Sequence, residues 1–214
     1  MLIFLQTDQS VCRKKTMNNI TTESSKSTRD RILDAALQIF SNKGYHDTKL
    51  DEIADESHTS KGAIYFHFPN KERLFLALVD QFADLLERRI TEAILKEKEG
   101  VDRVRAALEA CLETFGRYRL PAKILLVQAV GLGNVFEKKR SEINDRFANL
   151  IRIYLDEAIA IGDLDPVDTE VVSYAWMGAI YGIVIRWVYT GEPEPQRILS
   201  TLIPVLLKSV GHHG

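Results

Sequence analysis

The sequence predicts an all-α protein of about nine helices, with a small N-terminal helix-turn-helix domain followed by a larger C-terminal helical domain. Apolar residues recur at the three- and four-residue spacing of amphipathic helices, and Gly, Pro and capping residues separate these segments. After residue 27 no run alternates with the two-residue period of a β-strand. Apolar residues make up 45% of the 214 residues, which is ordinary for a globular protein with a substantial core.

The first predicted helix begins at Thr28 and ends at Lys43-Gly44, because Gly readily adopts the left-handed backbone that closes many helices. One face of this helix carries apolar side chains that can pack against the next two helices. These residues are Ile32, Ala35, Ala36, Ile39 and Phe40.

The second predicted helix is short. Leu50, Ile53 and Ala54 stand three and four residues apart, so they form one apolar stripe over about two turns. Thr48 and Asp51 match the Ser/Thr-x-x-Asp/Glu pattern in which a hydroxyl and a carboxylate satisfy free amides at a helix start. We therefore expect Thr48 to cap this helix.

A four-residue turn, residues 57–60, separates the second helix from a third. Ser60 is a suitable N-cap for the third helix. Ile64 and Phe68 stand four residues apart and can point inward together. Pro69 ends the helix, because it lacks an amide hydrogen and disfavours helical geometry at the preceding residue. Two short helices joined in this way are typical of a helix-turn-helix.

The segment from residue 28 to about residue 80 resembles the tetracycline-repressor (TetR) family of transcriptional regulators. The matching residues are Gly44, Tyr45, Thr48, Ile53, Ala54, Ser60, Lys61, Gly62, Ile64, Tyr65, His67, Phe68, Asn70, Lys71 and Glu72. The chain departs from the family at His58, where Gly is usual, and at Thr59. His tolerates left-handed geometry better than most residues, so we expect a slightly strained turn.

The resemblance implies a set of DNA contacts on the third helix and at its borders. Tyr65 and Lys71 occupy family positions that contact phosphates, and Thr48 stands at a helix start that can do the same. The full expected set is Thr48, Ser60, Lys61, Gly62, Ala63, Tyr65, His67 and Lys71. Lys61 can bond guanine and Ala63 can touch a thymine methyl. The alternatives are a solvated Lys, a small filler Ala and a packed His67 ring.

The rest of the chain reads as six further helices. They cover Lys71 to about Leu95, Val101 to Arg117, Pro121 to about Gly131, Ser141 to Ile161, Asp168 or Thr169 to about Gly191, and a last helix after Pro193 that contains Pro204. We expect residues 1–27 to be an extension without fixed structure, 28–75 a DNA-binding domain, and 76–214 a regulatory and dimerisation domain. Met17 is an alternative start.

The helix that begins near Thr169 is apolar almost all round, so both of its sides must be covered. One side can meet its own domain, and the other needs a partner. Ala175, Gly178, Ala179 and Gly182 are small enough for close helix approach, although they can also simply fit the local core. TetR-like proteins dimerise through their last two helices, so pattern and resemblance both predict a homodimer with two-fold symmetry. The apolar run from Val171 to Ile185 is too short to suggest a membrane span.

Large apolar side chains in the C-terminal helices can line a ligand cavity or form an ordinary core. The candidate ligand-binding residues are Phe115, Tyr118, Phe147, Trp176, Met177, Tyr181 and Arg186. Arg186 is the one charge between Glu170 and Glu192, so it either reaches water near a helix end or pairs with an anionic ligand.

Enzyme and cofactor motifs are not found: there is no H-E-x-x-H, Walker loop or nucleophile elbow. Cys12 and Cys111 fit neither a metal spacing nor a disulfide framework, and His46 and His58 are expected to be loop histidines. We expect no catalytic residue, no metal and no cofactor, and a cytoplasmic location. The net charge of −2 gives no overall attraction to nucleic acid, so local placement of positive groups must supply it.

We therefore predict a ligand-responsive repressor that binds a palindromic operator in double-stranded DNA as a homodimer, with a small apolar or amphipathic ligand. The alternatives within regulation are an activator and a repressor without a ligand. The alternative outside regulation is a helical ligand-storage or interaction dimer. The sequence does not identify the ligand, the operator or the target genes.

Overall fold

The structure is a computed structural model and describes residues 26–98 and 100–211. Over these residues it holds nine α-helices, one π-helix and no strand, which confirms the all-α prediction. The elements are α1 (Thr28–Asp47), α2 (Leu50–Glu56), α3 (Lys61–His67), α4 (Lys71–Ile94), α5 (Gly100–Arg117), α6 (Arg119–Lys123), η1 (Ile124–Gln128), α7 (Asn134–Ala160), α8 (Thr169–Thr190) and α9 (Pro195–Lys208). Residues 1–25, with Cys12 and Met17, and the His212-His213 segment lie outside the described residues.

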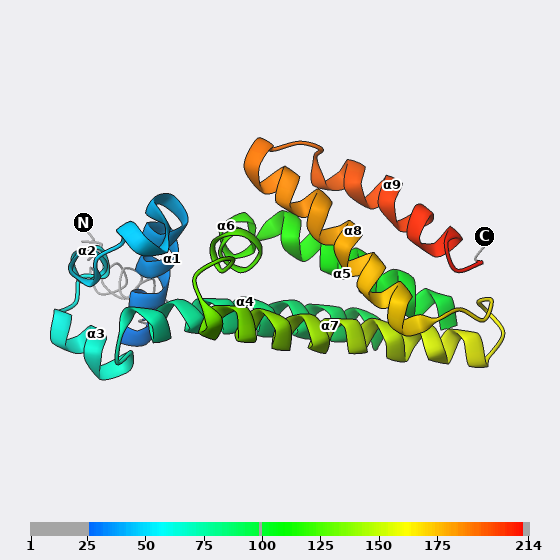
Figure 1. The fold of residues 1–214 in the computed structure, drawn as a ribbon, viewed down its shortest axis with the longest axis horizontal. Helices are drawn as coiled ribbons and strands as arrows, with labels where there is room; N and C mark the ends of the chain where they lie inside the picture. The colour runs from blue at the N-terminus through cyan, green and yellow to red at the C-terminus, as the bar shows by residue number, and fades with distance from the viewer. Residues whose placement is uncertain (1–25, 99, 212–214) are drawn as a thin grey trace, which may run out of the picture.

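Figure 1 shows α1, α2 and α3 grouped at one end of an elongated molecule. We call these three helices the head and α4–α9 the body. The α4 helix begins in the head and runs the length of the body beside α7 (Figure 1). The α5 helix packs against α4, α7 and α9, and α8 packs against α7. Since α4 packs against α1 of the head and against α5 of the body, it connects the two parts.

The first helix ends where the sequence predicts. Although the α-helical hydrogen bonding of α1 continues to Asp47, Gly44 interrupts it with φ 83° and ψ 170°, angles that suit a residue without a Cβ. The predicted cap of α2 is wrong. Lys49 is the N-cap, and its backbone N–H donates to Glu52 Oε2 at 3.2 Å. The hydroxyl of Thr48 instead donates to the carbonyl of Gly44 at 2.7 Å.

Two other predicted helix boundaries move. The α6 helix begins at Arg119, two residues before Pro121, because Pro is tolerated in the first turn of a helix. The α7 helix begins at Asn134, well before the predicted Ser141. The added segment buries Phe136, which continues the apolar side of α7 and gives these extra turns a packing partner in the head.

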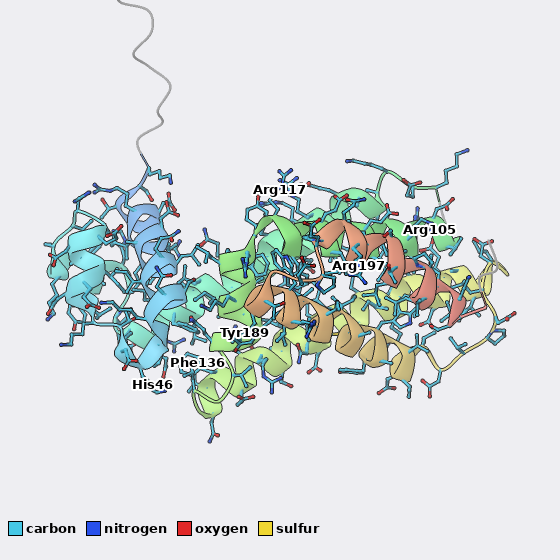
Figure 2. The ribbon with its side chains drawn as sticks, turned by 90° about the horizontal axis from the view of Figure 1, so that it is seen from above. His46, Arg105, Arg117, Phe136, Tyr189 and Arg197 are labelled. Atoms are coloured by element: carbon cyan, nitrogen blue, oxygen red, sulfur yellow. The ribbon has the colours of Figure 1, made fainter. Side chains whose placement is uncertain are left out.

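An aromatic cluster joins head and body. Phe136 of α7 lies edge-on against Tyr45, with ring centroids 5.2 Å apart, and against Phe75 of α4 at 5.6 Å. Phe40 of α1 packs edge-on against Phe75 at 5.1 Å. Figure 2 shows Phe136 beside His46 at this junction. The start of α7 therefore contacts the head directly, in addition to the connection made by α4.

Candidate nucleic-acid interface and ligand cavity

The α3 helix is fixed by its cap and by its buried side. The Ser60 Oγ accepts the backbone N–H of Ala63 at 3.1 Å, which confirms Ser60 as the N-cap. Ile64 is fully buried and Phe68 nearly so, as the four-residue spacing predicts. His58, in the turn before α3, has φ 51°, which is the left-handed backbone conformation expected at a position where the TetR family, which this segment resembles, usually has Gly. The turn therefore keeps its geometry despite the substitution.

Opposite the buried side, α3 presents an exposed outer face. We define the outer face of α3 as the four exposed residues Lys61, Gly62, Tyr65 and Phe66. Ala63 and His67 are half-buried and lie at its edges. The face therefore offers one ammonium group, one phenol hydroxyl, one large apolar ring and a glycine that allows close approach of the backbone.

Phe66 is the residue that the sequence analysis missed. Its side chain is 84% exposed, although most exposed positions in a free protein are polar. The ring of His67 packs edge-on against it, with centroids 5.1 Å apart. The signal was present in the sequence: Phe66 stands two residues from both Ile64 and Phe68, so a helix that buries those two must turn Phe66 outward.

Lys61 reaches back to the preceding helix. Its Nζ lies 2.7 Å from Asp51 Oδ1, and both side chains are more than half exposed. The hydrogen bond to Asp51 and its negative charge raise the pKa of Lys61, so this side chain keeps its positive charge. An exposed ion pair between two flexible side chains is weak. The ammonium of Lys61 can therefore exchange Asp51 for a stronger acceptor such as a phosphate or a guanine edge.

Two of the predicted phosphate contacts do not fit the structure. The side chain of Thr48 is 1% exposed and its hydroxyl is bound to Gly44, so it faces the protein interior. The Lys71 Nζ donates to the carbonyls of Tyr45 at 2.8 Å, His46 at 3.2 Å and Thr48 at 2.9 Å. An ammonium has three N–H donors, and these carbonyls use all of them. Lys71 thus ties the start of α4 to the end of α1.

Replacing Lys71 with Ala should therefore destabilise the protein. The carbonyls of Tyr45 and Thr48 would lose a charged donor in a partly buried setting, which costs about 2 kcal/mol. For a chain of this size that corresponds to a melting temperature lower by about 4–8 °C. Lys43→Ala removes an exposed ion pair with Glu52 and should leave the melting temperature nearly unchanged. A Lys71→Ala protein that melts like the wild type would contradict this assignment.

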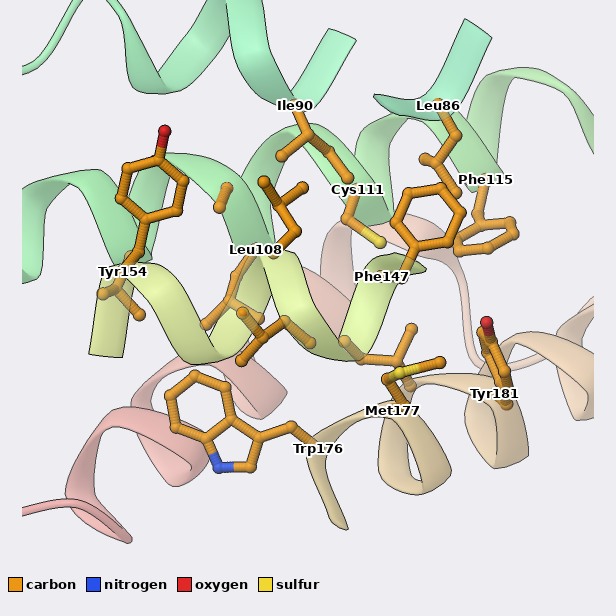
Figure 3. Close-up of a pocket in the computed structure, with 15 residues that line it drawn as sticks. Leu86, Ile90, Leu108, Cys111, Phe115, Phe147, Tyr154, Trp176, Met177 and Tyr181 are labelled. Atoms are coloured by element: carbon orange, nitrogen blue, oxygen red, sulfur yellow. The ribbon is translucent and has the colours of Figure 1, made fainter. Parts of the chain in front are cut away.

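A cavity lies inside the body between α4, α5, α7 and α8 (Figure 3). Its volume is about 50 Å³, and none of the 15 residues that line it is charged. Five of the seven predicted ligand residues line it: Phe115, Phe147, Trp176, Met177 and Tyr181. Ten further lining residues were not predicted from the sequence, namely Leu86, Ile90, Val104, Ala107, Leu108, Cys111, Leu150, Ile151, Tyr154 and Ile180.

Two predicted ligand residues lie elsewhere. Tyr118 borders a surface groove with Arg89 and Gln196. Arg186 is exposed and lines an open groove between α8 and α9, beside Glu192 and Arg197. Arg186 therefore does not reach this cavity. The reason is the rotation of α8, which turns Arg186 away from α7.

The thiol of Cys111 faces the cavity (Figure 3). Burial raises the pKa of Cys111 to about 12, so at pH 8 the thiol stays protonated and little of the reactive thiolate is present. We expect the native protein to react with a thiol reagent at pH 8 far more slowly than the unfolded chain, which can be followed by absorbance. The Cys12→Ser variant restricts the signal to Cys111. Equal rates for native and unfolded protein would show that the thiol is not shielded.

The α8 helix has the predicted caps and an uncovered apolar face. Asp168 Oδ1 accepts the backbone N–H of Val171 at 3.1 Å, and Gly191 follows the helix with φ 79°. We define the open face of α8 as six exposed small and apolar residues in its first two-thirds, Val171, Tyr174, Ala175, Gly178, Ala179 and Gly182. A Cβ atom added to Gly178 or Gly182 would meet nothing within 4 Å. This face is open within a single chain.

By length and composition alone, α8 could cross a membrane, and it is the one helix of the described residues that meets this test. Only 39% of its most apolar window is buried within the chain. This test allows up to two charged residues, so its apolar window can extend past Arg186, beyond the uncharged stretch from Val171 to Ile185. A single such helix is weak evidence for a span, since a helix that another chain covers has the same composition.

Comparison with known proteins places these features in a family. The family model described as "Bacterial regulatory proteins, tetR family" matches residues 32–78, which include α2, α3 and the start of α4. The chain is 30% identical over 178 residues to the HTH-type transcriptional regulator UidR of Escherichia coli, covering 78% of this chain and 85% of UidR.

The solved structures that it resembles have the same helical fold. The transcriptional regulator FadR from Bacillus subtilis, in complex with stearoyl-CoA, superposes with a TM-score of 0.76 at 20% identity, over 85% of this chain and 98% of FadR. AibR, in complex with isovaleryl coenzyme A and operator DNA, gives a TM-score of 0.70 at 21% identity, over 85% and 98%. Together with the match over the helix-turn-helix and the similarity to UidR along most of both chains, these findings show that the chain belongs to the TetR family of bacterial transcriptional regulators.

Proposed function

We propose that this regulator is a ligand-responsive repressor, which binds a palindromic operator as a homodimer and leaves it when an apolar ligand enters the body. The observation that carries the proposal is the outer face of α3, where Lys61, Tyr65 and Phe66 are exposed together on one helix. Such a face has the size and chemistry to enter a major groove. We assign DNA binding to residues 28–75 and regulation and dimerisation to residues 76–214.

Within the DNA-binding part, we assign direct base contacts to Lys61 and Phe66, and close backbone approach to Gly62. The hydroxyl of Tyr65 is placed to bind a phosphate, which fixes position but reads no sequence. Ala63 and His67 border this surface, and Ser60 acts by capping α3. The positive charge comes from individual side chains, because residues 28–80 contain more acidic than basic groups.

Dimerisation through α8 and α9 would cover the open face of α8. Two copies of these helices would form a four-helix interface about a two-fold axis. A two-fold dimer presents its α3 helices to half-sites one helical turn apart, about 34–36 Å, or a multiple of that distance. A chromosomal operator implies a cytoplasmic location.

The cavity is the proposed ligand site. FadR and AibR, named above as acyl-CoA complexes, support an apolar or amphipathic ligand for a cavity of this composition. At about 50 Å³ the cavity is much smaller than the roughly 300–1,000 Å³ of typical ligand pockets, so a ligand must separate the surrounding helices. Leu86 and Ile90 of α4 line it, so this expansion would push on the helix that continues into the head. A coupling of about 1–3 kcal/mol suffices to lower operator affinity.

Retention of genomic DNA tests the proposal. Purified full-length protein is immobilised, incubated with fragmented DNA of its source organism and washed, and bound DNA is measured with and without decanoyl-CoA. We expect retention without the ligand and release with it, together with increased expression of a reporter placed behind a retained fragment. If the amount of retained DNA is the same with and without decanoyl-CoA, the proposal that an acyl-CoA releases the operator is contradicted. A reporter that loses expression when the regulator is deleted would indicate an activator.

A further inference from the structure

At one end of the cavity a tyrosine hydroxyl contacts a polar side chain of α7. Figure 3 shows Tyr154 and Tyr181 at opposite ends of the cavity, with apolar side chains between them. At the Tyr181 end, its hydroxyl donates to Asn144 Oδ1 of α7 at 3.2 Å. Arg140 stands one helical turn before Asn144 on α7, so both project from the same side of the helix. The residues that line the cavity itself carry no charge.

Arg140 lies one helical turn from Asn144, which accepts the hydrogen bond of Tyr181. Burial raises the pKa of Tyr181, and the positive charge of Arg140 opposes this rise. The Arg140 side chain is 42% exposed, so solvent and ligands can reach it. A guanidinium one helical turn from Asn144, the partner of Tyr181, can bind an anionic group through two parallel N–H groups.

We propose that Arg140, Asn144 and Tyr181 bind the anionic head of an amphipathic ligand whose hydrocarbon tail occupies the apolar cavity. This inference rests on the proposed ligand response and specifies its chemistry. The anionic oxygens belong to a carboxylate, as in a fatty acid, or to phosphates, as in an acyl-CoA. Arg186, the charged candidate from the sequence, cannot serve, because it lies in the groove between α8 and α9.

The same arginine is tied to the junction with the head. Arg140 donates through Nε at 3.0 Å and Nη2 at 2.6 Å to Glu137 Oε2. The other oxygen of Glu137 accepts the backbone N–H of Gly131 at 2.9 Å. Phe136, next to Glu137, packs on Tyr45 of the head. A ligand that draws Arg140 away from Glu137 would therefore loosen the start of α7 where it contacts the head.

The test compares three ligands with the same tail: decanoate, decanoyl-CoA and the uncharged decanol. Binding to the full-length protein is measured by titration calorimetry. Arg140→Gln is compared with Arg152→Gln, a matched control farther along α7 that contacts Asn149 in the same i−3 direction. We expect Arg140→Gln to weaken the binding of decanoate, of decanoyl-CoA or of both at least about tenfold. Binding of decanol should be unchanged. Arg152→Gln should bind all three like the wild type.

The two anionic ligands identify the source of the head group. If decanoate binds and loses affinity in Arg140→Gln, the group is a carboxylate; if only decanoyl-CoA does so, it is a phosphate. Equal affinity of wild type and Arg140→Gln for the anionic ligands, binding of neither anion, or equal affinity of the wild type for decanol and decanoate would overturn the inference. DNA retention without ligand is measured in parallel. If the wild type retains no DNA, the proposed function fails, independently of the result for Arg140.

Discussion

Phe66→Ala is expected to abolish most of the operator affinity while leaving the stability of the protein unchanged. The side chain is 84% exposed, so its removal creates no cavity in the free protein. In the complex, truncation would remove apolar contacts of the ring with base edges or thymine methyl groups, and burying a Phe side chain is worth about 1.5–3 kcal/mol. Because a dimer carries two copies, the combined loss is about 3–6 kcal/mol, which lowers the affinity at least about 100-fold. Gel shift on a retained fragment and thermal melting measure the two quantities.

Phe68→Ala is the informative comparison, because it removes the same side chain two residues away on the opposite side. Phe68 is 3% exposed, and its truncation should cost about 3–5 kcal/mol of unfolding free energy. Replacing individual thymines of the operator with uracil removes only the methyl group. At a base that Phe66 contacts, this change should weaken wild-type binding and leave Phe66→Ala binding unaffected. Full operator affinity for Phe66→Ala would remove this residue from the DNA interface.

Gly178→Arg is expected to convert the dimer into a monomer and to lower operator affinity at least about 100-fold, because the two α3 helices would no longer be held together. Within one chain the substitution is harmless: an added Cβ meets nothing within 4 Å, and Arg favours a helix over Gly by about 1 kcal/mol. Only a partner that approaches the open face of α8 would clash with the long side chain. Light scattering during gel filtration gives the mass, and gel shift gives the affinity.

Ile153→Arg is the matched control for this prediction. Ile153 lies on α7, is 49% exposed and stands outside the open face of α8. The same change from a smaller apolar residue to Arg should leave mass and operator affinity as in the wild type. A Gly178→Arg protein that remains dimeric would place the interface elsewhere, and a dimeric Gly178→Arg without DNA binding would point to damage of the head.

The head could be predicted closely because its determinants are local. Each of these determinants depends on residues within one or two helical turns. They are the cap at Ser60, the buried pair Ile64 and Phe68, and the stop at Pro69. The wrong assignments involve contacts between distant segments. Lys71 binds carbonyls that stand 23 to 26 positions earlier, and no sequence spacing reveals that contact. Thr48 is a local exception, because its hydroxyl binds the carbonyl of Gly44, four residues earlier, and does not cap the start of α2.

The cavity was predicted only in part, for a related reason. Phe115, Phe147 and Trp176 could be predicted as lining residues from their size, because large apolar residues in a helical body are usually buried. The rotation of each helix about its axis decides which of them meet. Since α8 is apolar almost all round, its sequence carries little information about that rotation. Arg186 and Tyr118 were therefore assigned to a cavity that they do not reach.

Sequencing the genomic fragments that the wild-type dimer retains would test most directly whether the outer face of α3 reads DNA. The expected result is an inverted repeat shared by the fragments, with half-site centres about 10–10.5 base pairs apart or a multiple of that spacing. Tyr65→Ala should retain much less of the same sequence. Retained fragments without a common motif, or equal enrichment by Tyr65→Ala, would contradict DNA recognition by this helix.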